Sequence, residues 1–268
     1  KILEGWETDF PLLHVTRYMG ELIGRRIDAM APFEAGGLNS PIVLTLAGLR
    51  AILFVAVIAL RAVGWIPSDM LLNAAIVADT ILFHVAGLCL IVFALRRWKL
   101  AWRHAFGLSR HDLLRQIAYA VSFYVGVMPV VLLAAIVYAA FLYDVGYPIN
   151  PGDTQEVVTI FTQASYPMWL KIYMGVMAVT LAPLVEELLF RGIALPLIAR
   201  HVGAGWAIFI VSTMFAMLHF HVPSFVPLFV IATAFSYAYL YSGSILVPVI
   251  MHALFNAVHG QTCAVNDP

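Results

Sequence analysis

Residues 117–143 read IAYAVSFYVGVMPVVLLAAIVYAAFLY, an apolar run without any Asp, Glu, Lys or Arg. A helix needs about 20 largely apolar residues to cross the hydrocarbon core of a membrane, and this run is longer than that. The rest of the chain has the same character, because 62% of its 268 residues are hydrophobic and only 11% are charged. Soluble domains average about 45–50% apolar and about 25% charged residues. The sequence therefore predicts an all-α, polytopic integral membrane protein.

Other apolar windows of similar length bring the expected number of membrane-spanning helices to about seven. Besides residues 117–143, these windows cover 41–63, 70–95, 171–199, 204–220, 225–241 and 245–261. Residues 1–40 interleave apolar and basic side chains, which is typical of an amphipathic segment that lies at the membrane surface. We therefore expect an interfacial segment over 1–40 and one transmembrane helical domain over 41–268.

The distribution of basic residues predicts which side of the membrane each connection faces. The connection over 96–115 contains six of them, Arg96, Arg97, Lys99, Arg103, Arg110 and Arg115. Arg200 follows two spans later, on the same side. Because Lys and Arg are enriched in cytoplasmic loops, we expect this side to be cytoplasmic. The acidic connection over 144–167 then lies outside, and the chain begins inside and ends outside.

Bulk charge and cysteine content exclude several classes of function. The 15 basic and 15 acidic residues cancel to a net charge of zero. The chain therefore lacks the excess of positive charge that is typical of nucleic-acid-binding proteins. Cys89 and Cys263 lie on different predicted segments and indicate no disulfide framework. The first residues, KILEGWETDF, place acids where a signal peptide has a basic start, so we expect no cleavable targeting segment.

The span over 171–199 contains charged residues that are unfavourable in lipid. Each of Glu186, Glu187 and Arg191, within the sequence APLVEELLFR, costs about 2.5–3.5 kcal/mol near the centre of a membrane helix. Residues four apart share a helix face, which predicts a Glu187–Arg191 pair. Glu186 points about 100° away and has no partner on its own helix, which favours it as the base in a proton transfer. The alternative is that all three form a structural ion network.

Two later spans carry polar side chains at the same four-residue spacing. Phe215 and His219 share one face of the span over 204–220, and His252 and Asn256 share one face of the last span. Each pair also has a purely structural interpretation, either as a satisfied core histidine or as an interhelical hydrogen bond.

Depth along the helices indicates that these segments form one site. At about 1.5 Å per residue, Glu186 lies about 21 Å, His219 about 24 Å and Asn256 about 17 Å from the predicted cytoplasmic ends of their helices. His252 comes out about one turn, roughly 6 Å, closer to the cytoplasmic end. We therefore expect the first three to converge at one height, with His252 displaced toward the cytoplasm.

The three patterns E-E-x-x-x-R, F-x-x-x-H and H-x-x-x-N occur in this order and resemble those of the CPBP or Abi superfamily. This superfamily includes type II CAAX prenyl endopeptidases and bacteriocin-processing membrane proteases. The resemblance covers residues 178–259, within a protease-like core at 171–261. It implies a glutamate-dependent intramembrane peptidase that acts on a membrane-associated or lipidated peptide, in the plasma membrane of a prokaryote.

The resemblance also implies a role for each motif residue. Glu186 and His219 would activate the attacking water, and His252 and Asn256 would stabilise the oxyanion of the tetrahedral intermediate. The remaining motif residues, which would support the site, are Glu187, Arg191 and Phe215. The independent interpretation of the residues agrees, because hydrolysis of a peptide bond needs a base and hydrogen-bond donors of these kinds.

No cofactor is expected, although a zinc site is an alternative. Glu186, His219 and His252 could form a His-His-Glu zinc set with one open position. The H-E-x-x-H spacing of many zinc peptidases is absent, and Arg191 lies close to this set. Neither histidine has an obvious acidic residue to orient it, as zinc ligands usually have, which favours metal-independent water activation.

Two other classes of function remain open. A non-catalytic membrane partner, acting in immunity or assembly, could use the same scaffold. A transporter or channel would spread its charged residues along a pathway, whereas these lie at one predicted depth. The expected partners are the lipid bilayer and a membrane-associated peptide or protein substrate, with a second membrane protein in the non-catalytic alternative.

Overall fold

The computed structural model describes residues 113–148 and 156–262, and residues 73–108 except positions 75, 79, 98 and 100. All regular secondary structure within these ranges is helical. The predicted interfacial segment over 1–40 and the predicted span over 41–63 lie outside the described residues.

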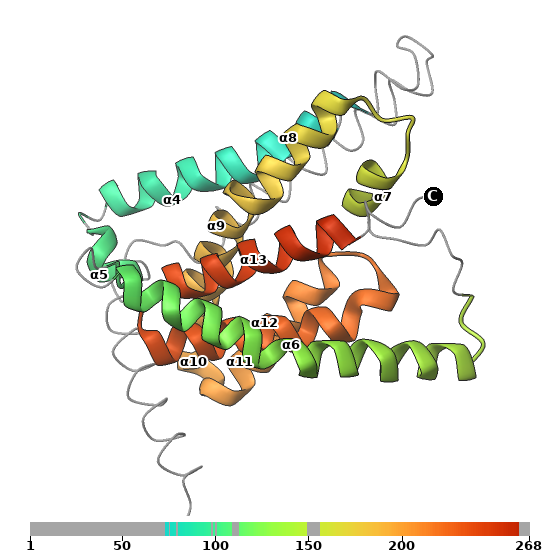
Figure 1. Cartoon of the computed structure of the whole chain (residues 1–268). Coiled ribbons are helices and arrows are strands. Elements are labelled where there is room, and N and C mark those ends of the chain that lie inside the picture. Colours follow the sequence, from blue (N-terminus) through green and yellow to red (C-terminus); the bar gives the residue numbers. More distant parts are fainter. Residues whose placement is uncertain are drawn as a thin grey trace, which may run out of the picture. The chain divides into compact units, whose positions relative to one another are not determined.

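The described helices fall into two compact units. The first ends at Trp102 and contains a π-helical turn, η1 (Ile81–Val85), that continues into α4 (Ala86–Arg97). The second begins at Arg103, within α5 (Trp102–Phe106), and contains the later elements (Figure 1). In chain order these are α6 (Leu113–Asp144), α7 (Glu156–Thr162), α8 (Met168–Val179), α9 (Leu181–Glu187), the π-helical η2 (Leu188–Ala194), α10 (Leu195–Val202), α11 (Ala204–Met217), the 3₁₀ turn η3 (Val222–Ser224), α12 (Phe225–Ser242) and α13 (Leu246–Thr262).

The lengths and compositions of these helices fit a membrane protein. Four described stretches are long and apolar enough to cross a membrane, namely Ile76–Phe93, Leu113–Asp144, Met168–Val202 and Val222–Ser242. Two shorter apolar helices cover Ala204–Met217 and Leu246–Val258. Each predicted window from residue 70 onward therefore corresponds to a helix. The prediction of an all-α membrane helical bundle is confirmed.

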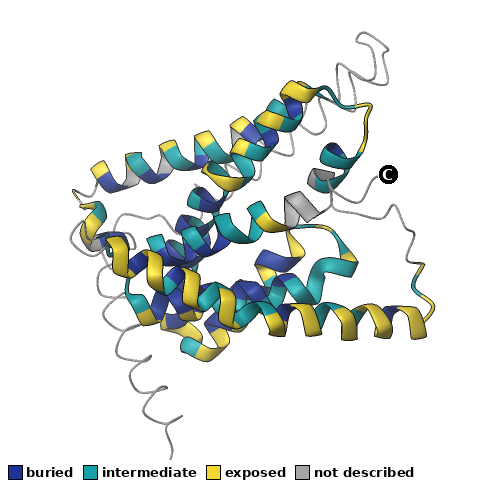
Figure 2. Ribbon diagram, viewed as in Figure 1, coloured by how far each residue is buried: buried dark blue, intermediate teal, exposed yellow. Residues whose placement is uncertain are grey.

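Burial within the second unit distinguishes an inner group of helices from an outer one. Figure 2 shows many buried residues on α9, α10 and α12, whereas α6 has a largely exposed face. That face carries apolar side chains such as Val125, Leu133 and Ile136, as expected of a helix surface in contact with lipid. Elsewhere α6 packs against α12 and α13.

The helical stretch over 168–202 is interrupted twice around the Glu-Arg motif. The break at Thr180 (φ −118°, ψ −78°) precedes Pro183, whose ring clashes with the carbonyl four positions earlier in a continuous helix. The π-helical η2 follows Glu187 and ends just before Pro196. Proline has no N–H group to donate to the helical hydrogen bonds. π-helical turns are rare and often lie at functional sites.

Phe106 connects the start of α13 to the middle of this stretch. Its carbonyl accepts a hydrogen bond from the amide of Ile245, one residue before α13, at 3.0 Å. Its buried ring packs directly on Gly192, where an added Cβ atom would come within 2.7 Å of a ring carbon. Only a residue without a side chain permits this approach. Phe106 therefore links the start of α13 to the helical stretch at Gly192.

Gly192→Ala should destabilise the protein, because the added methyl group must displace the buried Phe106 ring. Overpacking of this kind costs about 1–3 kcal/mol. Gly126→Ala is the matched control: a Cβ atom at this helical position meets nothing within 4 Å, so the change should be neutral or slightly stabilising. Thermal unfolding of the purified protein in detergent micelles measures both. Equal melting temperatures for the two variants would contradict a tight contact at Phe106.

Candidate active site

A buried ion pair lies inside the second unit. Nη1 of Arg191 donates to Oε1 of Glu187 at 2.9 Å, and both side chains are 0% exposed. The four-residue spacing predicts this pair, and it forms even though the chain between the two residues is π-helical. Either charge alone would be strongly unfavourable here, so each residue requires the other.

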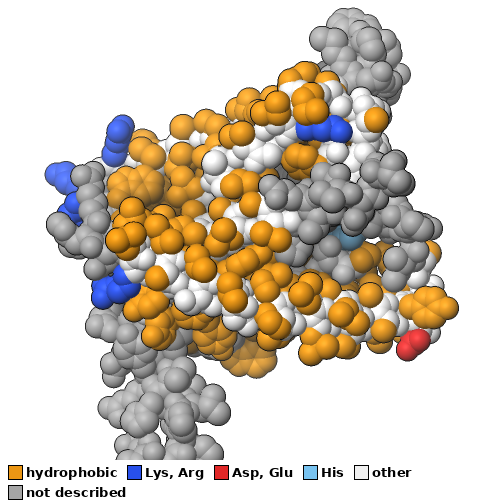
Figure 3. All heavy atoms as spheres, viewed as in Figure 1, with side chains coloured by type: hydrophobic (Ala, Val, Ile, Leu, Met, Phe, Trp, Pro, Cys, Tyr) orange, Lys and Arg blue, Asp and Glu red, His pale blue; other side chains and the backbone are white. Residues whose placement is uncertain are grey.

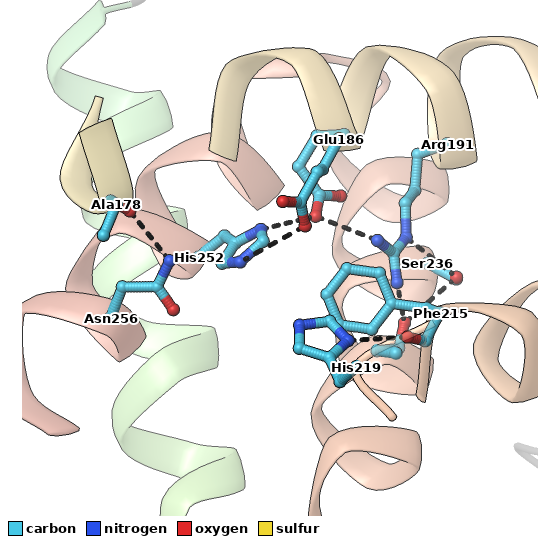
Figure 4. Close-up of polar contacts among 10 residues, drawn as sticks. Ala178, Glu186, Arg191, Phe215, His219, Ser236, His252 and Asn256 are labelled. Atoms are coloured by element: carbon cyan, nitrogen blue, oxygen red, sulfur yellow. Dashed lines mark hydrogen bonds and ion pairs between the residues drawn. The ribbon is translucent and has the colours of Figure 1, made fainter. Parts of the chain in front are cut away.

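Arg191 also binds α12. Its Nη2 donates to the carbonyl of Ala232 at 2.7 Å, and its Nε donates to Oγ of Ser236 at 3.4 Å. The Ser236 hydroxyl donates in turn to the Ala232 carbonyl at 3.1 Å. These contacts, drawn in Figure 4, give the guanidinium partners on a second helix and attach that helix to the Glu-Arg motif.

Three aromatic rings surround the guanidinium. Its central carbon lies 4.9 Å from the ring centre of Phe215, 5.3 Å from that of Phe235 and 5.9 Å from that of Phe190. A cation within about 6 Å of a ring centre is attracted to the ring, most strongly away from water. The F-x-x-x-H pattern predicts a supporting role for Phe215, whereas no sequence pattern singles out the other two rings.

His252 lies between the two glutamates. Its Nδ1 is 2.9 Å from Oε1 of Glu187, and its Nε2 is 4.0 Å from Oε2 of Glu186. Because Glu187 is ion-paired with Arg191, it accepts the Nδ1 proton, and Nε2 faces Glu186. The Glu187 side chain is fully buried, while that of Glu186 is 19% exposed. The adjacent glutamates therefore have different surroundings, as helix phase predicts.

His252 meets the glutamates, although residue counting places it about one turn nearer the cytoplasm than Glu186. Its Nε2 is 4.0 Å from Oε2 of Glu186. The counting assumes that α13 begins level with the end of α10, whereas Phe106 connects the start of α13 to Gly192, in the middle of the 168–202 stretch. The contact between His252 and the glutamates thus depends on packing between segments that are distant in sequence.

Asn256 lies one turn beyond His252 on α13. Its Nδ2 donates to the carbonyl of Ala178 on α8 at 2.8 Å. Since Ala178 precedes the break at Thr180, α13 packs along both α8 and α9. Asn256 thus contacts α8, one turn of α13 beyond His252. The amide has two N–H donors, and this bond uses one of them.

His219 lies at the end of α11, where its Nδ1 is 2.7 Å from the carbonyl of Phe215. A carbonyl only accepts, so Nδ1 carries the proton of the neutral ring and Nε2 has the lone pair. The His219 ring lies 4.8 Å from the Phe215 ring, which also lies 5.5 Å from the ring of His252. One phenylalanine thus contacts both imidazoles, as Figure 4 shows.

Glu186, His219 and His252 are not arranged as a metal site. Within the described ranges, no group of three or more His, Cys, Asp or Glu residues has such an arrangement. One sequence-based reason against zinc is nevertheless wrong, because His252 does have an acidic partner in Glu187. Histidines that bind zinc commonly donate their other nitrogen to a carboxylate in this way. A metal titration therefore has to decide between the two chemistries.

Comparison with known proteins identifies the segment that carries these residues. The family model described as "Rce1-like: Type II CAAX prenyl endopeptidase Rce1-like" matches residues 167–258. This range contains all three motifs, from Glu186 to Asn256, and the resemblance is confirmed. The family is one of proteases, and the match together with the apolar helices indicates a multi-pass membrane protein. A search of curated proteins and a search of solved structures found no match.

Arg191→Leu should destabilise the bundle strongly, because it leaves the Glu187 charge buried without its partner. Breaking such a pair costs about 3–5 kcal/mol. Arg200→Leu, at an exposed position on α10, is the matched control and should change stability by about 0.5 kcal/mol or less. The free energy of unfolding in detergent measures both variants.

The double variant Glu187→Leu/Arg191→Leu removes both charges and should recover much of the lost stability. If it were no more stable than Arg191→Leu alone, an uncompensated Glu187 charge would not be the cause of the loss.

Proposed function

We propose that this chain is an intramembrane, glutamate-dependent endopeptidase that hydrolyses a peptide bond of a membrane-associated or lipidated polypeptide. One observation carries the proposal: the imidazole of His252 lies between a buried, arginine-paired carboxylate and a second, partly exposed carboxylate. The match of residues 167–258 to a family of CAAX prenyl endopeptidases supports the same class of reaction. The proposed catalytic residues are Glu186, His219, His252 and Asn256.

Glu186 and His219 are proposed to activate the attacking water. The Glu186 side chain is 19% exposed, whereas Glu187 is fully buried and held by Arg191. His219 is half-buried, and its Nε2 has the lone pair because Nδ1 donates to the carbonyl of Phe215. A carboxylate and a neutral imidazole nitrogen can each accept a proton from water.

His252 and Asn256 are proposed to bind the oxyanion. Because Nδ1 of His252 donates to Glu187, its Nε2 can donate a hydrogen bond to the oxyanion only when both ring nitrogens carry a proton. Asn256 contributes the amide N–H that Ala178 does not use. A single donor of this kind contributes about 2.7–4 kcal/mol to transition-state stabilisation in a well-studied hydrolase.

The proposed reaction needs water as its only co-reactant. The water oxygen bonds to the scissile carbonyl carbon, one water proton passes to the Glu186–His219 base, and the carbonyl oxygen becomes the oxyanion. The C–N bond then breaks as the carbonyl re-forms, and the proton passes to the leaving nitrogen. The products are a carboxylic acid and an amine, without a change in oxidation state.

We further propose that this peptidase lies in the plasma membrane of a prokaryote, with the bilayer and the substrate as its partners. Its proposed catalytic side chains lie on apolar helices or, in the case of His219, two residues after the end of one. A polypeptide at or in the membrane can reach them most directly. The net charge of zero gives the chain no attraction for the phosphates of nucleic acids.

Glu186→Ala and His219→Ala should each abolish cleavage of the native substrate while the protein stays folded. Loss of a positioned base lowers rates by about 10²–10⁴-fold. Immunoblotting of the substrate in isolated membranes measures cleavage, and thermal unfolding in detergent checks the fold.

His201→Ala is the matched control for these variants. His201 is exposed in the last turn of α10, far from the turn that carries His219. It should retain wild-type cleavage. If Glu186→Ala and His219→Ala both remained fully functional in cells, the chain would act as a non-catalytic partner in immunity or assembly instead.

Cleavage should persist when metal ions are removed. The purified protein is incubated with EDTA or 1,10-phenanthroline, assayed for cleavage and analysed for bound metal. We expect unchanged activity and zinc well below one equivalent. Activity that disappears with the chelator and returns with added zinc would instead assign Glu186, His219 and His252 to a zinc site.

A further inference from the structure

The proposed base His219 lies in the turn that joins α11 to α12. α11 begins at Ala204, shortly after Arg200 at the end of α10. α12 returns from the turn, and the hydroxyl of Ser244, two residues after its end, donates to Oε1 of Gln116 near the start of α6 at 2.8 Å. Both open ends of the α11–α12 hairpin therefore lie where α6 starts and α10 finishes, and the turn lies at the opposite end of the unit.

The length of α11 places this turn past the middle of the membrane. His219 follows Gly203 by 16 residues, which corresponds to about 24 Å at about 1.5 Å per residue. The hydrocarbon core is about 30 Å thick, so its midplane lies about 15 Å from each surface. With Gly203 at one surface, beside the exposed Arg200, His219 lies in the far half of the membrane.

The two ends of the unit differ in charge. The end at which α6 starts exposes Arg115 and Arg200, and Arg103 in α5, shortly before α6, is also exposed. At the other end α6 finishes at the exposed Asp144, and the ammonium of Lys171 there donates to a backbone carbonyl. Figure 3 shows an acidic side chain where α6 ends and a basic side chain where it begins. Since Lys and Arg concentrate on the cytoplasmic side, the turn lies on the non-cytoplasmic side.

The turn is open at the molecular surface. Phe220, directly after His219, has a left-handed backbone (φ 49°), a conformation that is unfavourable for a residue other than glycine. Its ring is 83% exposed, and Met217 and Leu218 before it are also exposed. The backbone thus reverses immediately after the proposed base, which leaves His219 beside an exposed apolar surface.

We infer that the substrate reaches the site from the non-cytoplasmic side of the membrane, past the turn over 218–224. The substrate class is then an exported or translocated polypeptide and not a lipidated C-terminus presented in the cytosol. The substrate class rests on the proposed peptidase function, whereas the side of access rests on the fold and the charge distribution alone.

Single-cysteine variants test the side of access without any substrate. In a background of Cys89→Ser and Cys263→Ser, F220C marks the turn, D144C marks the same end, and R200C marks the opposite end. Intact cells are treated with a membrane-impermeant maleimide, before and after permeabilisation. F220C and D144C should react in intact cells at least about tenfold more than R200C, because the thiolate reacts only where reagent and water reach it. All three should react after permeabilisation.

Two outcomes of this labelling would overturn the inference. Reaction of R200C but not of D144C in intact cells would show that the protein has the opposite orientation in the membrane. Reaction of D144C without any reaction of F220C, even after permeabilisation, would place the turn in lipid and exclude aqueous access through it.

The substrate class is tested by mapping new protein termini in cells that express the wild type or Glu186→Ala. Termini that depend on Glu186 should lie in non-cytoplasmic segments of membrane-associated or exported proteins. Dependent termini at cytoplasmic ends would overturn the inference and leave the peptidase function intact. The absence of any dependent terminus would count against the proposed function itself, and the labelling would then decide the side of access alone.

Discussion

One carboxylate oxygen, Oε1 of Glu187, accepts hydrogen bonds from both Arg191 and His252, each at 2.9 Å. A buried carboxylate without such partners is strongly unfavourable, so the helices that supply the donors have to pack against it. Arg191 extends the network to α12, His252 attaches α13, and Phe215 of α11 contacts both. A single buried negative charge thereby organises helices that are distant in sequence, and the same contacts position the proposed catalytic residues.

The two imidazoles are held through the same atom by chemically different partners. Nδ1 of His219 is hydrogen-bonded to a backbone carbonyl, and Nδ1 of His252 is hydrogen-bonded to a carboxylate. A backbone carbonyl is a neutral acceptor, whereas a carboxylate carries a negative charge. The proposed roles differ in the same way, because His219 would accept a proton and His252 would donate a hydrogen bond. Helix phase makes a similar distinction between Glu186, which is partly exposed, and Glu187, which is buried.

The sequence predicts those features that depend on local periodicity. Apolar windows identify the membrane helices because lipid leaves few alternatives, and four-residue spacing identifies the Glu187–Arg191 pair. It does not predict the contributions of Ala178 and Ala232, because these act through backbone carbonyls that every residue possesses. Nor does it predict that Glu187 binds His252, since spacing orders residues along a helix but not the depth at which the helix begins. That depth depends on a contact between distant residues.

The π-helical turn over Leu188–Ala194 restricts the length of the chain as well as its composition. A π turn closes its hydrogen bonds over one more residue than an α turn. Loss of a single residue here would let the helix close as an ordinary α-helix and would rotate everything beyond it by about 100° relative to Glu187. Arg191 would then leave α12. The spacing between Pro183 and Pro196 is therefore fixed by geometry, and a related sequence that keeps this site can vary in length only outside that interval.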